Sequence, residues 1–268
     1  MKTCATALCI LAAALTSAAA GFIGGDILFD LGAGARSAGM GGAGIALPAS
    51  DALFVNPAGL PWVEGIQVVS TYGNVFDVAD FGALSVGMPG LAAAGLVLDA
   101  GTIGPALAYR TTGAVVGAGV RLGPLGAGVR ARLVRPVAPV PGAGGALDFA
   151  LLWRGPVQVG AVWRAILSQA PVAAESWPAE LEVGLALPVR GFGLSASLAL
   201  DVTGVGTDPS FALGGEVGAD WLFIRAGYGP AGVAIGGTVR WRPFALDWAV
   251  LLHPVLPATY RVSFAVRL

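Results

Sequence analysis

From residue 63 to the C-terminus, short segments in which large apolar residues alternate with small or polar ones follow one another along the chain. In residues 192–202, one face carries phenylalanine, leucine and valine, and the other carries glycine, serine, alanine and aspartate. Residues 181–190 and 260–268 are divided in the same way. Alternation with a period of two predicts strands. In a soluble β-sandwich the large residues would face a protein core and the outer face would be polar. Here the large residues stand opposite glycine, alanine and charge, so we predict an all-β, transmembrane antiparallel β-barrel whose large side chains face lipid.

The composition agrees with a membrane environment. Of 268 residues, 56% are hydrophobic and only 12% are charged, whereas a soluble domain carries roughly 25% charged residues. The 42 glycines disfavour a bundle of spanning helices, and the charge-free run at residues 81–98 is interrupted by a predicted turn at residues 87–90. A net charge of −1 excludes both the basic surface of a nucleic-acid-binding protein and the high charge of a disordered chain.

The turn signals predict fourteen strands. Tight connections, such as Gly123-Pro124 and Gly155-Pro156, alternate with mostly longer ones. Bacterial barrels have an even number of strands, short periplasmic turns and longer extracellular loops. Residues 106–110 could form a further strand, but it would break this alternation. The predicted strands are residues 65–72, 80–88, 91–100, 113–122, 125–135, 145–154, 157–166, 181–189, 192–202, 211–219, 221–228, 232–242, 244–252 and 259–268.

The same register places many charged side chains inside the barrel. A charge on the lipid face costs a few kcal/mol near the middle of the membrane, so the register that faces charges inward is favoured. The principal predicted lumen charges are Arg130, Arg132, Asp201, Glu216, Arg225, Arg240 and Asp247.

The first twenty residues have the pattern of a secretory signal peptide. Lys2 precedes an apolar run, and the small residues at 18–20 suit cleavage before Gly21. Both cysteines lie within this segment, so the exported chain would have no thiol chemistry. We therefore expect a protein of the Gram-negative outer membrane.

No residues in the chain form a recognisable catalytic or metal-binding set. The one histidine, His253, follows a predicted strand beside a proline and suits a loop. We interpret Glu175, Glu180 and Glu182, near the longest loop, as surface charge. The sequence thus predicts a protein that is not an enzyme and has no cofactor or metal.

Residues 21–62 do not alternate and form a separate segment. Their glycines match G-x-G-x-x-G at residues 39–44, but a dinucleotide site needs a parallel strand and a βαβ unit, which an antiparallel barrel lacks. Asn56-Pro57 is a turn former that would end a short helix at residues 50–54.

The stretch LGAGARSAGMGGAGIAL, followed by DALFVNPAGL, resembles the N-terminal region of FadL-like outer-membrane barrels and most closely their PorV/PorQ branch. Segments such as PAELEVGLALPV and FIRAGYG are similar to barrel strands of the same family, so the resemblance covers the mature chain. It implies a fourteen-stranded barrel at residues 63–268 with residues 21–62 folded into the lumen as a hatch. The residues of the hatch motif are Arg36, Gly39, Met40, Gly41, Gly42, Asp51, Asn56, Pro57, Ala58 and Gly59.

Two functions remain open at this point, besides a purely structural role. The motif favours a PorV-like, non-catalytic accessory or shuttle component of protein secretion, with a large translocon or a secreted cargo protein as partner. The alternative is a FadL-like channel for hydrophobic small molecules. In this alternative, glycine and alanine in the lumen leave room for a ligand that contacts Phe54 and Val55 of the hatch. Both place the barrel in outer-membrane lipid.

Overall fold

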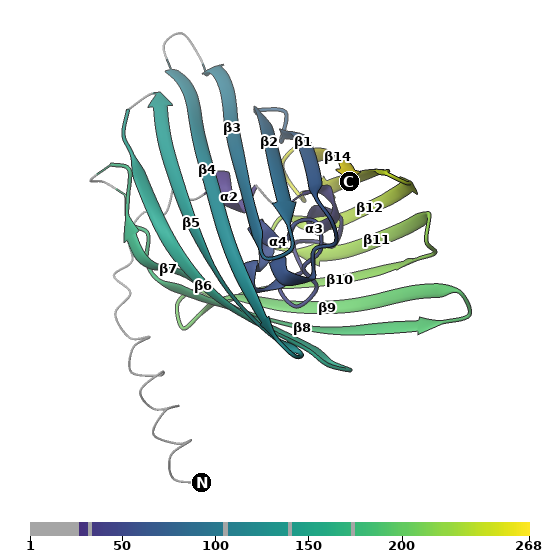
Figure 1. The fold of residues 1–268 in the computed structure, drawn as a ribbon. Coiled ribbons are helices and arrows are strands. Elements are labelled where there is room, and N and C mark those ends of the chain that lie inside the picture. Colours follow the sequence, from purple (N-terminus) through teal and green to yellow (C-terminus); the bar gives the residue numbers. More distant parts are fainter. Residues whose placement is uncertain (1–26, 32–33, 104–106, 139–140, 173–174) are drawn as a thin grey trace, which may run out of the picture.

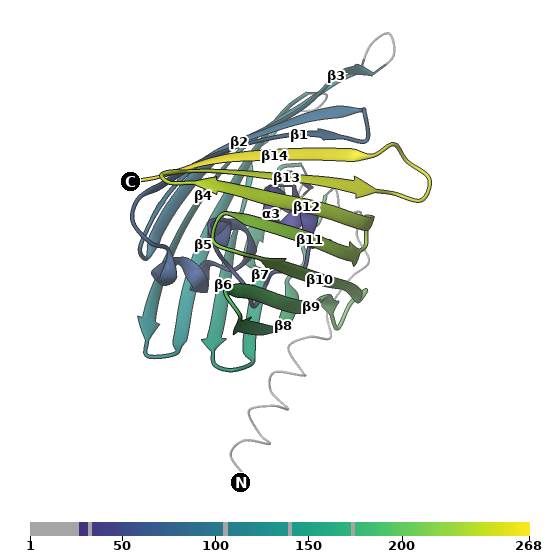
Figure 2. The same ribbon diagram turned by 90° about the vertical axis from the view of Figure 1, so that its right-hand side faces the viewer.

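The computed structural model describes residues 27–31, 34–103, 107–138, 141–172 and 175–268. Within them the chain forms a closed barrel around short helical segments (Figures 1 and 2). The helices are α2 (Ile27–Asp30), α3 (Ala35–Gly39), α4 (Ala52–Val55) and the 3-10 helix η1 (Pro57–Trp62). The strands are β1 (Gln67–Val75), β2 (Ala79–Met88), β3 (Leu91–Ile103), β4 (Leu107–Leu122), β5 (Leu125–Ala138), β6 (Gly144–Arg154), β7 (Gln158–Gln169), β8 (Glu180–Gly191), β9 (Leu194–Val205), β10 (Ser210–Gly218), β11 (Leu222–Gly229), β12 (Gly232–Trp241), β13 (Phe244–Leu252) and β14 (Thr259–Arg267).

The barrel closes through antiparallel pairing of sequence neighbours. Every strand pairs with the strands before and after it, and β1 pairs with β14, where Gln67 lies opposite Arg267. Closure leaves no strand edge with unpaired backbone groups, which a lipid environment requires. The predicted fold class and the number of fourteen strands are therefore confirmed. The predicted signal peptide, residues 1–20, lies outside the described residues.

The largest difference from the predicted strands lies between β3 and β4. The loop expected at residues 101–112 is mostly strand, because β3 runs to Ile103 and β4 begins at Leu107. The two strands continue their pairing across one register shift. Residues 107–110 therefore belong to β4 and are not part of a further strand. The continued ladder satisfies backbone groups that an open loop would leave to water.

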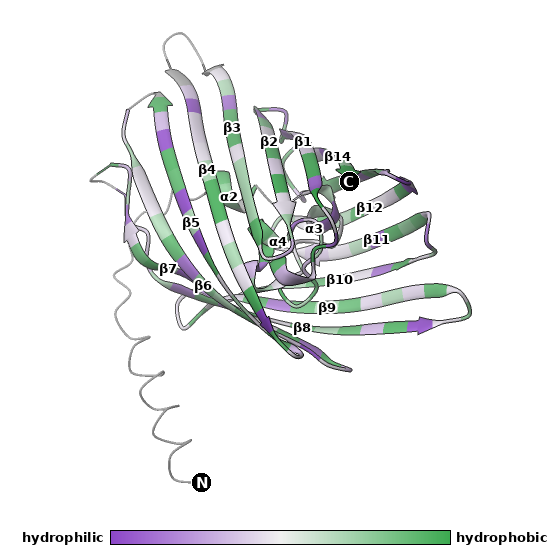
Figure 3. Cartoon of the chain, viewed as in Figure 1, coloured by the Kyte–Doolittle hydropathy of each residue, from purple (hydrophilic) through white to green (hydrophobic). Residues whose placement is uncertain are grey.

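The two faces of the strands differ as the alternation predicts. Leu198 and Leu213 face outward and are 61% and 56% exposed, whereas Ala199 and Ala212, their neighbours in the chain, face inward and are 2% and 7% exposed. In Figure 3 the strands carry alternating green and pale or purple bands, which is this period of two seen along the ribbon. Among the described residues, no helix has the length and apolar character to span a membrane.

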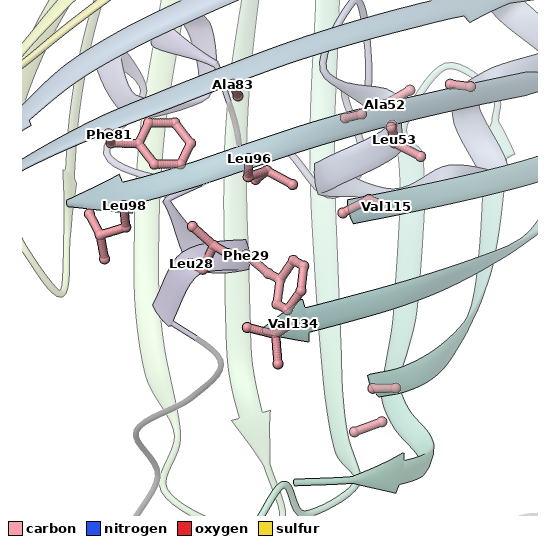
Figure 4. Close-up of a cluster of buried hydrophobic side chains, with 14 of the residues drawn as sticks. Leu28, Phe29, Ala52, Leu53, Phe81, Ala83, Leu96, Leu98, Val115 and Val134 are labelled. Atoms are coloured by element: carbon pink, nitrogen blue, oxygen red, sulfur yellow. The ribbon is translucent and has the colours of Figure 1, made fainter. Parts of the chain in front are cut away.

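Residues 34–62, called the luminal segment below, lie inside the barrel. Helix α3 contacts β12 and β13, and η1 contacts β4 and β5. Helix α2 also lies within the barrel, where Leu28 and Phe29 join Leu53 of α4 in an apolar cluster with side chains of β2 to β5 (Figure 4). The segment is therefore held by contacts with walls that are distant in sequence.

Inward-facing glycines allow the luminal segment to approach the wall closely. A Cβ atom at Gly128 would lie 2.4 Å from the carbonyl carbon of Pro57, and one at Gly227 would lie 2.2 Å from that of Met40. The expectation that lumen glycines leave room for a ligand is wrong at these positions, because the backbone of the luminal segment fills the space. Only a residue without a side chain permits such an approach.

Candidate functional site

Arg36 joins the luminal segment to a group of charges on the barrel wall. From α3 its guanidinium donates hydrogen bonds to both Glu216 carboxylate oxygens at 3.3 and 3.1 Å and to the Leu47 carbonyl oxygen at 2.9 Å. Glu216 also pairs with Arg225, which in turn contacts Asp247 at 3.2 Å. Four of the predicted functional residues thus form one network across β10, β11 and β13.

The electrostatic surroundings keep Arg36 charged although it is largely buried. Burial acts to lower the pKa of its guanidinium, but the negative charges of Glu216 and Asp51 outweigh burial and raise the pKa above its ordinary value. The Asp51 carboxylate lies 4.0 Å from Arg36. Two residues of the predicted hatch motif, Arg36 and Asp51, therefore lie next to each other within the luminal segment.

A single carboxylate holds the loop that follows α3. Asp201 of β9 is 1% exposed, and one of its oxygens accepts hydrogen bonds from the backbone amides of Gly44 and Ile45 at 2.6 and 2.9 Å. Hydrogen bonds to an ionised acceptor are stronger than those between neutral groups. Asp201 therefore anchors this loop from the wall.

The side chain of Asn56 links two parts of the luminal segment to each other and to the barrel wall. Its side-chain nitrogen donates to the carbonyl oxygens of Ile45 at 2.9 Å and of Leu151, on β6, at 3.2 Å. Its side-chain oxygen accepts from the Ala58 amide at 3.0 Å and caps η1. Helix α4 spans Ala52–Val55 rather than the expected residues 50–54, and it ends directly before Asn56, the residue at which the turn signal is expected to stop it.

One of two neighbouring lumen arginines holds α4 against the wall. Arg130 and Arg132 of β5 share the buried carboxylate of Asp148 at 2.7 and 2.9 Å. Arg130 also donates to the carbonyl oxygens of Leu53 and Phe54. These bonds satisfy two carbonyl groups of a four-residue helix that is too short to pair them all internally.

The glycines of the predicted hatch motif differ in what they contact. Gly39 lies against the Cα of Gly236 on β12, and Gly41 lies against the backbone of Tyr228 on β11. Gly41 has a φ of 69°, which glycine adopts without strain. Met40 between them is fully buried, while Gly42 lines a cavity in the lumen. The remaining motif residues, Pro57, Ala58 and Gly59, are buried in η1.

A cavity of about 490 Å³ lies in the lumen, between the luminal segment and the long-loop end of the barrel. Its apolar lining includes Phe29, Ile45, Phe54 and Val55. The two residues predicted to contact a ligand thus face this space. The volume lies within the range of about 300 to 1,000 Å³ that is usual for small-molecule sites.

Charged residues line one side of this cavity. They include Arg130, Asp201 and an ion pair in which Arg164 donates to Glu182 at 3.1 Å. Glu182 is 8% exposed, so its interpretation as surface charge is wrong: pairing with an arginine on β7 allows its burial. Glu180 also lines the cavity. The cavity is therefore largely apolar on the luminal segment, and its wall side carries both charged and apolar side chains.

Other predicted residues lie away from the cavity. Arg240 belongs to the inward-facing series of β12, but it is exposed at the end of the strand, where its guanidinium stacks on Phe223 at 4.4 Å. This arginine is thus at a mouth of the barrel rather than within the lumen. His253 accepts hydrogen bonds from two backbone amides of its own loop, which is a structural role. Among the described residues, no group of histidine, cysteine, aspartate and glutamate could hold a metal ion.

Sequence patterns did not reveal two aromatic contacts of the lumen. Trp177, in the loop between β7 and β8, is 5% exposed and packs edge-on against Phe29 of α2. Trp62 of η1 lies beneath Arg121 and Arg154, each 5.2 Å from its ring. No local pattern distinguishes these tryptophans from others at the ends of strands.

Comparisons with solved structures show which fold this is. CymD, a monoaromatic hydrocarbon channel, matches with a TM-score of 0.66 and 12% identity over 89% of this chain and 98% of that one. The toluene transporter TodX of Pseudomonas putida matches with a TM-score of 0.52 and 13% identity, over 88% and 97% of the two chains. A FadL homologue of Pseudomonas aeruginosa matches with a TM-score of 0.52 and 11% identity, over 87% and 98%.

No protein-family model and no curated protein sequence matches the chain. At the identities above, structural likeness shows the fold and leaves substrates open. The likenesses agree with the FadL-like part of the sequence resemblance and give no support to its PorV/PorQ branch. The chain therefore forms a fourteen-stranded barrel, and its fold is similar to that of FadL-like outer-membrane channels.

Proposed function

We propose that this protein is a FadL-type channel that passes hydrophobic small molecules across the outer membrane, with the luminal segment as its hatch. The observation that carries this proposal is the cavity of about 490 Å³, whose floor is the apolar surface of Phe54 and Val55. A site of this kind suits a small ligand that leaves water to contact apolar side chains.

The position of the cavity supports uptake from the long-loop side. Barrels of this class place long loops outside the cell and short turns in the periplasm. On the short-turn side of the cavity, the backbone of η1 packs directly against Gly126 and Gly128, where there is no space even for a Cβ atom. A ligand would therefore rest on the hatch, and its passage would require the hatch to shift.

The structural likenesses support the same substrate class. Two of them are named as a monoaromatic hydrocarbon channel and a toluene transporter, so small aromatic hydrocarbons are the first compounds to test. The predicted signal peptide supports export to the outer membrane. The secretion-accessory function gains no support from these likenesses.

A reversible cross-link between hatch and wall tests the proposal. A Cβ atom at Gly39 would lie 3.6 Å from the Cβ of Ala249 on β13, which is within the range of about 3.5–4.5 Å for a disulfide. The two cysteines of the sequence both lie in the predicted signal peptide, so the exported chain would contribute no other thiol. Uptake of radiolabelled toluene would be measured for G39C/A249C in a Gram-negative host that lacks its own FadL-type channels. We expect uptake to stop under oxidation and to return after reduction.

A second cysteine pair is the matched control. Gly87 on β2 and Ala92 on β3 have the same kind of spacing, 3.5 Å, but both belong to the wall. Oxidised G87C/A92C should transport as well as the reduced protein. If oxidised G39C/A249C transports normally, or if the unlinked protein adds nothing to the uptake of the host, the proposed function is wrong.

A further inference from the structure

Arginines gather at the short-turn end of the barrel. Six side chains at or beside these turns are exposed. They are Arg121, Arg154, Arg190, Arg240, Arg242 and Arg267, and together they are called the arginine ring below. They make up nearly half of the 14 arginines that the sequence contains. Their strands come from all around the barrel, so the ring encircles one mouth of the lumen; Figure 2 shows the short turns at one end.

Few acids balance this ring. Among the described residues at the short-turn end, the acids are Glu64 and Asp220, and Arg267 is the one member of the ring with a carboxylate partner, Glu64 at 3.0 Å. The opposite end is different, since it exposes charges of both signs: Asp77 and Asp208 as well as Arg110 and Arg135. The barrel therefore presents a strongly positive mouth on one side and a surface of mixed charge on the other.

The ring faces water rather than lipid. Arg121, Arg154 and Arg190 each continue the inward-facing series of their strands. At the same level, the outward-facing positions carry aromatic side chains such as Trp153 and Trp241, which are 42% and 47% exposed. Aromatic side chains at this height are typical of the boundary with lipid head groups. The geometry thus separates a lipid-facing aromatic belt from an arginine ring around the aqueous mouth.

Three guanidinium groups of the ring are held by cation–π contacts. Arg121 and Arg154 lie over the ring of Trp62, and Arg240 lies over Phe223. Such a contact leaves N–H groups free to pair with a carboxylate. It also restricts the side chain, which reduces the conformational entropy that binding would cost.

We infer that the arginine ring is a docking surface for the acidic face of a soluble protein on the short-turn side of the membrane. Charge complementarity and oriented guanidinium groups favour carboxylates as the bound groups, and the inward position of the ring favours a partner in water over the membrane. This interaction is separate from the proposed transport, since it involves neither the cavity nor the movement of the hatch.

The test uses a labelled octaglutamate peptide and the full mature chain in phosphatidylcholine nanodiscs. Binding would be followed by fluorescence anisotropy at low and at physiological salt. The variant R190Q/R242Q removes two exposed side chains for which the structure shows no ion pair or ring contact, so folding should be unaffected. The matched control is R110Q/R135Q, which removes two exposed arginines near the opposite end. We expect peptide affinity to fall at least fivefold in R190Q/R242Q and less than twofold in the control, and to weaken with salt.

Two other results would overturn the inference. Equal binding by the wild-type protein and R190Q/R242Q would show that the ring does not hold carboxylates. Loss of peptide binding when the nanodiscs contain phosphatidylglycerol would show that anionic lipid head groups occupy the ring instead. A second variant, R121Q/R154Q, checks the stacked members: its affinity for the peptide should fall by at least the same factor.

Discussion

Replacing Gly128 by alanine tests directly whether the luminal segment depends on close packing against the wall. A Cβ atom there would lie 2.4 Å from the Pro57 carbonyl carbon, about 1 Å nearer than the 3.4 Å of ordinary contact. Overpacking of this kind costs about 1–3 kcal/mol. The wall is a continuous ladder and η1 is a short helix, so we expect η1 to move. A cost of about 2 kcal/mol corresponds to roughly thirtyfold more frequent opening of the luminal segment.

Hydrogen exchange followed by mass spectrometry measures this opening. Peptides from residues 44–62 of G128A should exchange roughly thirtyfold faster than in the wild type, while peptides from the strands keep their protection. Gly95 on β3 provides the control, because a Cβ atom there would have no atom within 4 Å. Unchanged exchange in G128A, or an equal increase in G95A, would refute the idea that wall glycines accommodate the luminal segment.

Three further substitutions test the anchors and the register. Asn56→Ala removes three hydrogen bonds of the buried side chain and should destabilise the luminal segment by about 3 kcal/mol, read as lost exchange protection at residues 44–62. Asp148→Asn removes the negative charge that two buried arginines share and should lower barrel stability by up to about 3–5 kcal/mol, seen as a lower unfolding temperature on heat-modifiable gels. Leu198→Arg on the lipid face should cost about 2–4 kcal/mol of stability and reduce the folded fraction. Ser197→Arg lies on the inner face opposite Glu216, so this variant should fold normally. Equal damage from both substitutions would contradict the register.

The barrel could be predicted because its signal is local and repeated. Alternation in residues 192–202 assigns Leu198 outward and Asp201 inward without knowledge of any neighbour, and the structure confirms both. The even number of strands followed from the order of short and long connections. The ends of β3 and β4 could not be predicted in this way, because their extension depends on pairing with each other and not on a local pattern.

The interior could be predicted only in part. Motif residues such as Arg36 and Asn56 were identified, but their partners Glu216 and Leu151 are 180 and 95 residues away, and no local pattern links such distant positions. The role of the lumen glycines was misread for the same reason: a strand pattern shows which residues face inward, but not what fills the space. Composition alone therefore suggested a larger free volume in the lumen than remains once the luminal segment is in place.

Native mass spectrometry of the protein, extracted from the outer membrane in mild detergent, tests the central claim most directly. If the cavity above Phe54 and Val55 is a site for hydrophobic molecules on their way through the barrel, a fraction of the barrels should retain a small hydrophobic compound. Exchange of Phe54 for aspartate should abolish that retention without unfolding the barrel. Wild-type barrels that never carry a small molecule, with or without a bound second protein, would contradict the channel function.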